Sequence, residues 1–152
     1  RDYHFPLGVE PGRMYPPGSL LPMLIRNKVQ TPTPVASMLR RGLVERVGGF
    51  EDRFRGMFED QVFFAKTHII SHCHVDGRSW AKYRQHDDSC TAQSSGRMHD
   101  IRARARFLRW LHRHLRRQKV KDAAVRGALT LAWIDVAEQI ARLAARKLLR
   151  RA

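Results

Sequence analysis

The stretch Phe58-Glu59-Asp60-Gln61 opens a run over Glu59–Ile70 whose spacing predicts a helix. Its apolar positions are Val62, Phe63, Ala65, Ile69 and Ile70. Two adjacent carboxylates, Glu59 and Asp60, fall on the first turn of this helix. Acids favour that turn because they complement the positive end of the helix dipole. A carboxylate in the same place can also take a proton from a hydroxyl, so the flanking sequence has to separate the two interpretations.

The segment upstream predicts a strand, a short helix and a turn. Residues 31–34 are extended, because a residue before proline avoids the helical basin. Residues 35–39 then fit a short buried strand. Arg41–Val47 predicts a helix of about two turns that ends at Gly48. Gly49 and Phe50 are expected to turn the chain and bury an aromatic side chain.

The remaining segments of the first half are predicted more simply. Cys73–Val75 predicts a strand, Asp76-Gly77 a tight turn, and residues 80–85 the partner strand. Residues 87–96 are small and polar, which is typical of a mobile loop. At the other end, residues 1–18 are rich in Pro and Gly and predict an irregular connector, followed by a helix over residues 20–28.

Four of these pieces resemble one enzyme family when they are taken together. They are the Pro/Thr-rich segment 31–41 with its two final arginines, the turn Val47-Gly48-Gly49-Phe50, the pair Glu59-Asp60, and the segment 83–89. In this order and spacing they resemble the acceptor half of a bacterial family 2 glycosyltransferase of the GT-A type. The resemblance covers residues 18–96. It implies a partial α/β fold, the C-terminal part of a nucleotide-diphospho-sugar transferase domain, here followed by two amphipathic helices.

The resemblance implies that Asp60 is the catalytic base, which deprotonates the acceptor hydroxyl as that hydroxyl attacks the anomeric carbon. Glu59 is then its neighbour, binding acceptor hydroxyls or holding the helix terminus. Thr33 and Ser37 would line the acceptor pocket, as the matching strand does in the family. The alternative for these two is a stiff strand between prolines whose hydroxyls satisfy nearby backbone groups.

The segment 83–89 is the second expected site, since in the family it folds over the donor diphosphate. Its site residues here are Tyr83, Arg84, His86 and Ser89. Arg84 offers phosphate a planar fork of donors, and the resemblance makes His86 a ligand of the divalent metal or a hydrogen-bond partner of the diphosphate. After the histidine the family more often has Pro or Gly, where this chain has Asp87-Asp88. These acids add metal affinity or cap the loop, and the alternative for the whole segment is a strand end before a solvated loop.

The nucleotide-binding half of the family is expected to be missing. The chain begins with Arg1, and no Asp-x-Asp metal motif occurs before Pro34. In the family that motif lies in the first half and supplies the main ligands of Mg²⁺ or Mn²⁺. We therefore expect a fragment that is inactive alone, from an enzyme that uses one of these cations.

Four residues, His68, His72, Cys73 and His74, resemble a zinc cluster by residue type. His68 and His72 are four apart, but the helical spacing beyond Ile70 is doubtful and no Glu follows His68 as in a metalloprotease motif. Ordinary half-buried histidines beside a strand are the preferred interpretation. Cys73 and Cys90 are expected to be reduced, and the sequence leaves their pairing open.

The net charge of +15 lies almost entirely in the second half of the chain. Residues 1–96 hold 13 basic and 10 acidic side chains, a balance of +3, whereas residues 97–152 hold 16 and 4, a balance of +12. We therefore divide the chain at residue 96 into an acceptor-side part, 1–96, and a basic helical hairpin, 97–152. Residues 101–121 and 123–151 each have the spacing of an amphipathic helix, with the joint near Lys121-Asp122.

The basic hairpin has three interpretations. It lies on an anionic membrane surface through residues 101–151, with Phe107, Trp110 and Leu111 on its apolar side. It packs as a plain hairpin whose charges are solvated, which we rank equal. Nucleic acid ranks third and is not favoured as a partner, because no recognised motif and few aromatics suited to stacking are present.

The sequence as a whole predicts an inverting glycosyltransferase fragment in the cytoplasm, or peripheral on the inner face of the cell membrane. Its partners are a nucleotide-sugar donor and an acceptor that is a cell-surface polysaccharide or a lipid-linked glycan. The alternative is a non-catalytic basic module that binds anionic membrane or nucleic acid. No apolar signal segment or stretch of membrane-spanning length is present in the sequence.

Overall fold

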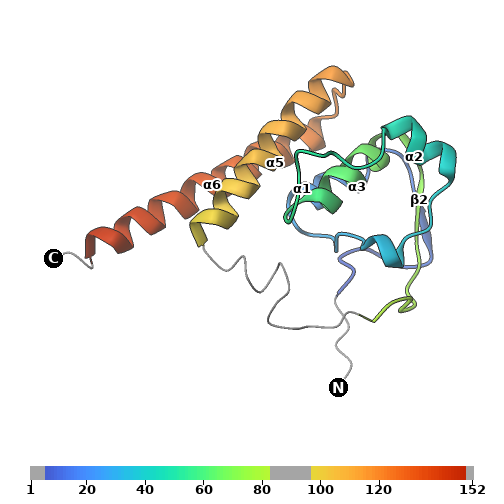
Figure 1. Cartoon of the computed structure of the whole chain (residues 1–152), viewed down its shortest axis with the longest axis horizontal. Coiled ribbons are helices and arrows are strands. Elements are labelled where there is room, and N and C mark those ends of the chain that lie inside the picture. Colours follow the sequence, from blue (N-terminus) through green and yellow to red (C-terminus); the bar gives the residue numbers. More distant parts are fainter. Residues whose placement is uncertain (1–5, 83–96, 150–152) are drawn as a thin grey trace. The chain divides into compact units, whose positions relative to one another are not determined.

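The computed structural model describes residues 6–82 and 97–149 and is helical for the most part, with one two-stranded antiparallel sheet (Figure 1). The chain divides into two compact units, Arg1–Gln85 and His86–Ala152, and each is described by itself. The expected domain boundary at residue 96 lies outside the described residues. This architecture fits a partial α/β fold with two helices after it.

The first unit contains both strands of the sheet. Strand β1, Arg13–Tyr15, pairs antiparallel with β2, Cys73–Val75, and Met14 lies opposite His74. The backbone N–H of Gly12 extends the pairing to the carbonyl of Val75 at 2.7 Å. The strand Cys73–Val75 is confirmed, but its predicted partner at 80–85 is wrong for residues 80–82, which are not in a strand. The partner comes instead from the segment that was expected to be an irregular connector.

The central element of this unit is α3, Glu59–Ile70, at the predicted bounds. Both α1, Leu21–Ile25, and α2, Arg41–Val47, contact it. All residues from Val62 to His68 are buried, so α3 is covered on every side rather than along one stripe. The other buried side chains of the core come from α1 and the loop before α3: Leu20, Leu21, Leu24, Ile25 and Phe54.

The turn after α2 has the predicted glycine cap. Gly48 is left-handed, with φ of 72°, and its N–H donates to the carbonyl of Glu45 at 3.1 Å. The N–H of Gly49 donates to the carbonyl of Val44 at 3.0 Å. This pair of bonds satisfies the last carbonyls of the helix, and glycine tolerates the left-handed backbone without a side-chain clash.

The buried strand predicted over 35–39 is wrong. Pro34–Ala36 forms a 3-10 helix, and Val35 and Met38 are 80% and 101% exposed. Proline suits the first position of a helical turn because its φ is already near the required value. The N–H of Ala36 and the hydroxyl of Ser37 both donate to the carbonyl of Thr33, at 3.1 and 2.8 Å. Local hydrogen bonds thus replace the ladder that a strand would need.

The second unit is a helical hairpin, with α5, Arg97–Arg117, followed by α6, Ala123–Leu149. The two helices contact each other (Figure 1), and the buried side chains of α6 lie between Val125 and Val136. The carboxylate of Asp122 accepts from the N–H of Val125 at 3.0 Å and so caps the start of α6. The predicted joint near Lys121-Asp122 is confirmed. No described helix is long and apolar enough to cross a membrane.

Candidate functional site

The approach to α3 brings Glu59 and Asp60 onto its first turn in an unusual way. The preceding residue, Phe58, has φ of 68°, which costs about 1 kcal/mol or more for a residue with a side chain. Gly56 is also left-handed, with φ of 82°, so the chain turns sharply before the helix begins. Phe58 supplies no side-chain cap. One N–H group of the first turn, that of Gln61, is instead satisfied by the turn's own Asp60 carboxylate.

Asp60 is partly buried and held in one orientation. Its Oδ1 accepts a hydrogen bond from the backbone N–H of Gln61 at 2.6 Å. Burial raises the pKa of the Asp60 carboxyl, the Gln61 N–H lowers it, and the neighbouring charge of Glu59 raises it, with a net rise above the ordinary value. A carboxylate with a raised pKa holds a proton more readily. The site therefore favours proton uptake at Asp60.

Glu59 has a buried oxygen without a partner. Among the described residues its Oε2 meets no hydrogen-bond donor. A buried acceptor left unsatisfied costs roughly 1–3 kcal/mol, a cost that a hydroxyl donor from a bound molecule would remove. Two neighbouring carboxylates thus differ in role: one is oriented by the backbone, and the other lacks a donor.

Lys66 ties the Gly48-Gly49-Phe50 turn to the middle of α3, and the sequence analysis missed it. The side chain is only 4% exposed, and its Nζ donates to the carbonyl of Gly49 at 2.6 Å and to Glu51 Oε1 at 3.3 Å. The ring of Phe50 stacks on Phe63 with 4.4 Å between centroids. Two motifs that are distant in the sequence are therefore fixed against each other. The available signal was a lysine inside an otherwise apolar run.

Thr33 and Ser37 are not brought to the carboxylates by any hydrogen bond among the described residues. The hydroxyl of Ser37 donates to the carbonyl of Thr33, which is the behaviour expected of a residue that satisfies local backbone. Both side chains are half-buried. The structure thus gives the backbone alternative a specific bond, and their acceptor-binding role stays a prediction.

The donor-side residues are not described. Tyr83, Arg84, His86 and Ser89 all lie in the range 83–96, as does Cys90. The predicted diphosphate contacts and the predicted metal ligand His86 therefore remain predictions. The candidate site consists of the first turn of α3 and the turn that Lys66 holds against that helix.

The four residues of the zinc interpretation do not gather. His68 is buried within α3, where burial lowers its pKa to about 4, and its ring lies 6.1 Å from that of Phe64. The helix ends before His72, and the next residues enter β2, where successive side chains such as those of Cys73 and His74 point to opposite faces of the strand. Burial raises the pKa of the Cys73 thiol, which disfavours the thiolate that zinc needs. Over residues 6–82 and 97–149 no three His, Cys, Asp or Glu side chains could hold a metal ion.

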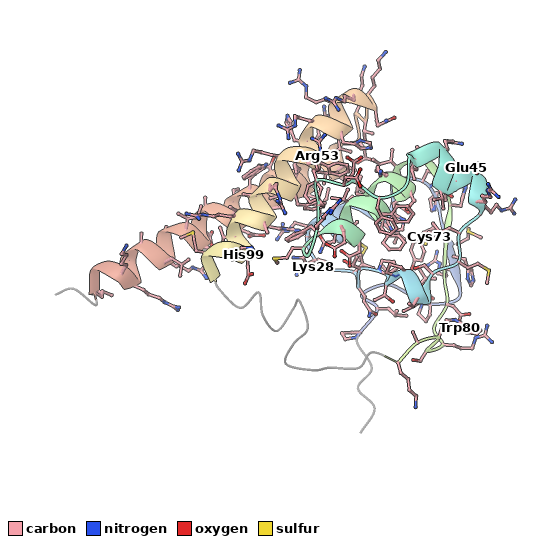
Figure 2. The ribbon with its side chains drawn as sticks, viewed as in Figure 1. Lys28, Glu45, Arg53, Cys73, Trp80 and His99 are labelled. Atoms are coloured by element: carbon pink, nitrogen blue, oxygen red, sulfur yellow. The ribbon has the colours of Figure 1, made fainter. Side chains whose placement is uncertain are left out.

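The apolar side of α5 bears on the interpretations of the basic hairpin. Phe107 and Leu111 are fully buried and Trp110 nearly so. Their burial fits the plain hairpin interpretation, and the membrane-surface interpretation of residues 101–151 stays a prediction. Nitrogen-tipped side chains project from α5 along its length (Figure 2).

Comparisons of the chain with models of known protein families, with curated proteins and with solved structures found no match.

Proposed function

We propose that this chain is the acceptor side of an inverting glycosyltransferase, which moves a sugar from a nucleoside-diphosphate donor to a hydroxyl of a glycan or lipid-linked acceptor. The observation that carries the proposal is the Asp60 carboxylate, partly buried on the first turn of α3 with its pKa raised. The order of motifs around it, which resembles family 2 glycosyltransferases, supplies the reaction type.

The proposed step uses the two oxygens of Asp60 differently. Oδ1 stays on the Gln61 N–H and fixes the plane of the carboxylate. Oδ2 takes the proton of the acceptor hydroxyl while its oxygen forms a bond to the anomeric carbon. The bond from that carbon to the donor diphosphate breaks in the same displacement, and its electron pair leaves with the diphosphate. Glu59 would accept a hydrogen bond from a second hydroxyl of the acceptor and thereby orient it.

The described residues form no binding site for the divalent cation that the resemblance implies. They hold no cluster of three metal-ligating side chains. The proposed ligands of Mg²⁺ or Mn²⁺ are therefore His86 and residues of the nucleotide-binding half. When bound, such a cation neutralises charge on a departing diphosphate.

The test is Asp60→Asn in the enzyme that joins this chain to its nucleotide-binding half. Asn keeps an oxygen for the Gln61 N–H but cannot take a proton, so we expect transfer to fall by about 10²–10⁴-fold with donor binding unchanged. Asp52→Asn is the matched control, because Asp52 is exposed in the loop before α3. Unchanged transfer in the Asp60 variant would exclude it as the base.

A basic binding module is the rival from another class, and the charge of the second unit is the observation that favours it. The coding sequence upstream separates the two. A βαβ pattern with Asp-x-Asp ahead of Arg1 supports the transferase, and its lack in the parent gene supports the module.

A further inference from the structure

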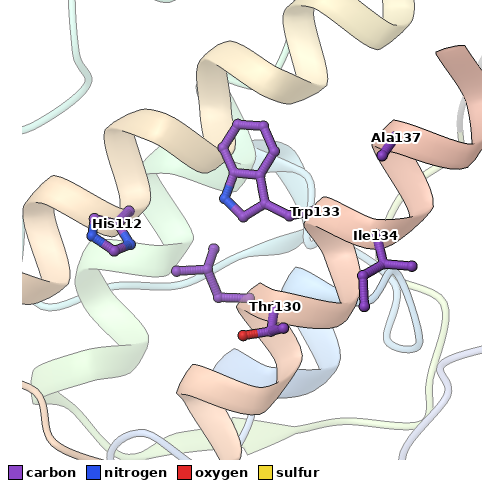
Figure 3. Close-up of a pocket in the computed structure, with 6 residues that line it drawn as sticks. His112, Thr130, Trp133, Ile134 and Ala137 are labelled. Carbon is purple, nitrogen blue, oxygen red and sulfur yellow. The ribbon is translucent and has the colours of Figure 1, made fainter.

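An open groove of about 460 Å³ runs between the two helices of the hairpin. Figure 3 shows the labelled residues that line it. One wall is His112 of α5, and the other is formed by α6 through Leu129, Thr130, Trp133, Ile134 and Ala137. All of these residues belong to the second unit. The groove is therefore a feature of the hairpin itself.

Basic side chains lie beside His112, the one α5 residue that lines this groove. Arg109 and Arg116 lie three residues before and four after His112, which places them on the same helix face. Both are exposed, and neither makes an ion pair among the described residues. The guanidinium Nε of Arg109 makes one long bond, 3.5 Å, to the carbonyl of Ala105. The positive charge of these two arginines, next to the groove, is thus open to a partner.

The charge continues beyond the groove. Arg102, Arg106, Arg109, Arg113 and Arg117 recur every three or four residues along α5 and cover about 22 Å of helix. Residues 97–149 carry 14 basic and 4 acidic side chains. Basic residues also stand at the hairpin joint and near the end of α6, at Lys119, Lys121 and Lys147. This stripe of charge along the helix complements an extended anionic partner.

The α6 wall is apolar and partly open to solvent. Ile134 is 47% exposed, and Trp133 is partly buried beside it. Two turns beyond Trp133 on the same side of the helix, Ile140 is also exposed. Tryptophan is the side chain that favours the boundary between headgroups and acyl chains. Because the apolar face of α5 is buried within the chain, α6 offers the exposed apolar surface beside the arginines.

We propose that this groove seats an anionic phospholipid, with the phosphate on Arg109, His112 and Arg116 and the upper acyl chain on Trp133 and Ile134. The arginines along α5 then lie against neighbouring headgroups, so that the hairpin docks on an anionic membrane surface. The groove complements both parts of such a lipid, whereas charge alone would complement only its headgroup. This inference is independent of the sugar-transfer proposal and stands if that one fails.

The test is flotation of the whole chain with vesicles of phosphatidylcholine, with or without phosphatidylglycerol. We expect binding only to the anionic vesicles. Each basic residue near such a surface strengthens binding about fivefold. The double variant Arg109→Glu/Arg116→Glu should therefore weaken it by more than about a hundredfold.

A matched pair of lysine substitutions separates a groove from mere charge. Ile134→Lys blocks the apolar wall and should weaken binding although it adds a positive charge. Leu131→Lys adds the same charge one turn away on α6, at a residue that is equally exposed, 48%, but outside the groove lining, and should leave binding intact or stronger. Circular dichroism confirms that each variant keeps its helices.

A second readout uses phosphatidylglycerol brominated on its acyl chains. Bromine should quench the tryptophan fluorescence of the chain, and Trp133→Phe should remove that quenching. Three results each overturn the proposal: no binding to anionic vesicles, stronger binding by Ile134→Lys than by the unchanged chain, or tighter binding to RNA or an acidic peptide than to the vesicles.

Discussion

Lys66 on α3 and Arg109 on α5 are two cations whose surroundings differ completely. Lys66 is enclosed, and its ammonium group is shared between the Gly49 carbonyl and Glu51. Arg109 stands on a helix surface without an ion pair among the described residues. Lys66 stabilises the fold, whereas the exposed guanidinium of Arg109 can bind an anionic group of another molecule. In the first unit this lysine is buried in the core around α3. In the hairpin the arginine is exposed on the surface of α5.

The largest effect is expected from the apolar side of α5. Phe107→Ala should lower the free energy of unfolding by about 3–5 kcal/mol, because the ring is fully buried and its removal leaves a cavity. Met98→Ala on the same helix, where the side chain is 42% exposed, should stay within about 0.5 kcal/mol. Urea unfolding followed by circular dichroism measures both. Equal effects would show that Phe107 is not packed as described.

Acid should weaken the first unit through His68. Burial lowers its pKa from 6.5 to about 4, so the folded state binds fewer protons than the unfolded state between these values. Stability is therefore full above pH 6.5 and is lost as the pH falls toward 4, by up to about 3 kcal/mol.

The check is unfolding at several pH values with His68→Leu, which should flatten the loss between pH 6.5 and 4. His72→Leu serves as the control, because His72 is exposed. If the slope persists without His68, the acid sensitivity has another source.

The contrast between the two cations predicts a smaller effect. Lys66→Met should cost about 2 kcal/mol, because the Gly49 carbonyl and the partly exposed Glu51 lose their donor. Lys28→Met, at an exposed lysine of the same unit, and Arg109→Ala should both stay within about 0.5 kcal/mol. Thermal unfolding compares the three. If Lys66→Met left the stability unchanged, packing and not the ammonium group would hold the turn in place.

The smallest effect should appear at Asp60, with the opposite sign. Its folded pKa is raised, so the group favours the folded state when protonated at low pH, and that contribution is lost as the pH rises. At neutral pH the charged form is disfavoured, and Asp60→Asn should stabilise the unit by about 0.5 kcal/mol or less. A gain in stability together with a loss of transfer is typical of a functional carboxylate. Destabilisation would instead favour its role at the helix terminus.

The elements that the sequence predicted well are those with local causes. The spacing of apolar residues set the bounds of Glu59–Ile70, and the glycine after Val47 set the end of Arg41–Val47. The pairing of β1 with β2 was missed because it joins segments about 60 residues apart. The apolar residues after Pro34 predict a buried strand, but a proline also suits the start of a 3-10 turn, and that turn forms instead.

The candidate site was predictable only in part, for a similar reason. Adjacent acids before an apolar run indicated the first turn of α3. The left-handed backbone of Phe58 carried no signal, since glycine is the residue that normally marks positive φ. Nor did the sequence show that Lys66 reaches back 17 positions to the Gly49 carbonyl, because that contact exists only once the turn lies against the helix.

The short pairing of Arg13–Tyr15 with Cys73–Val75 has a practical consequence for anyone who trims this chain. Gln30 donates to the Leu7 carbonyl, and Gly8 lies so close to Lys28 that any added methyl group would collide with its backbone. The segment before β1 is thus held close to residues 28–30, and β1 itself is then held by its pairing with β2. Cutting it away would bare one edge of Cys73–Val75, and an uncovered edge recruits strands from other molecules. Variants of the chain that begin after Tyr15 should therefore aggregate, even though their helices would still form.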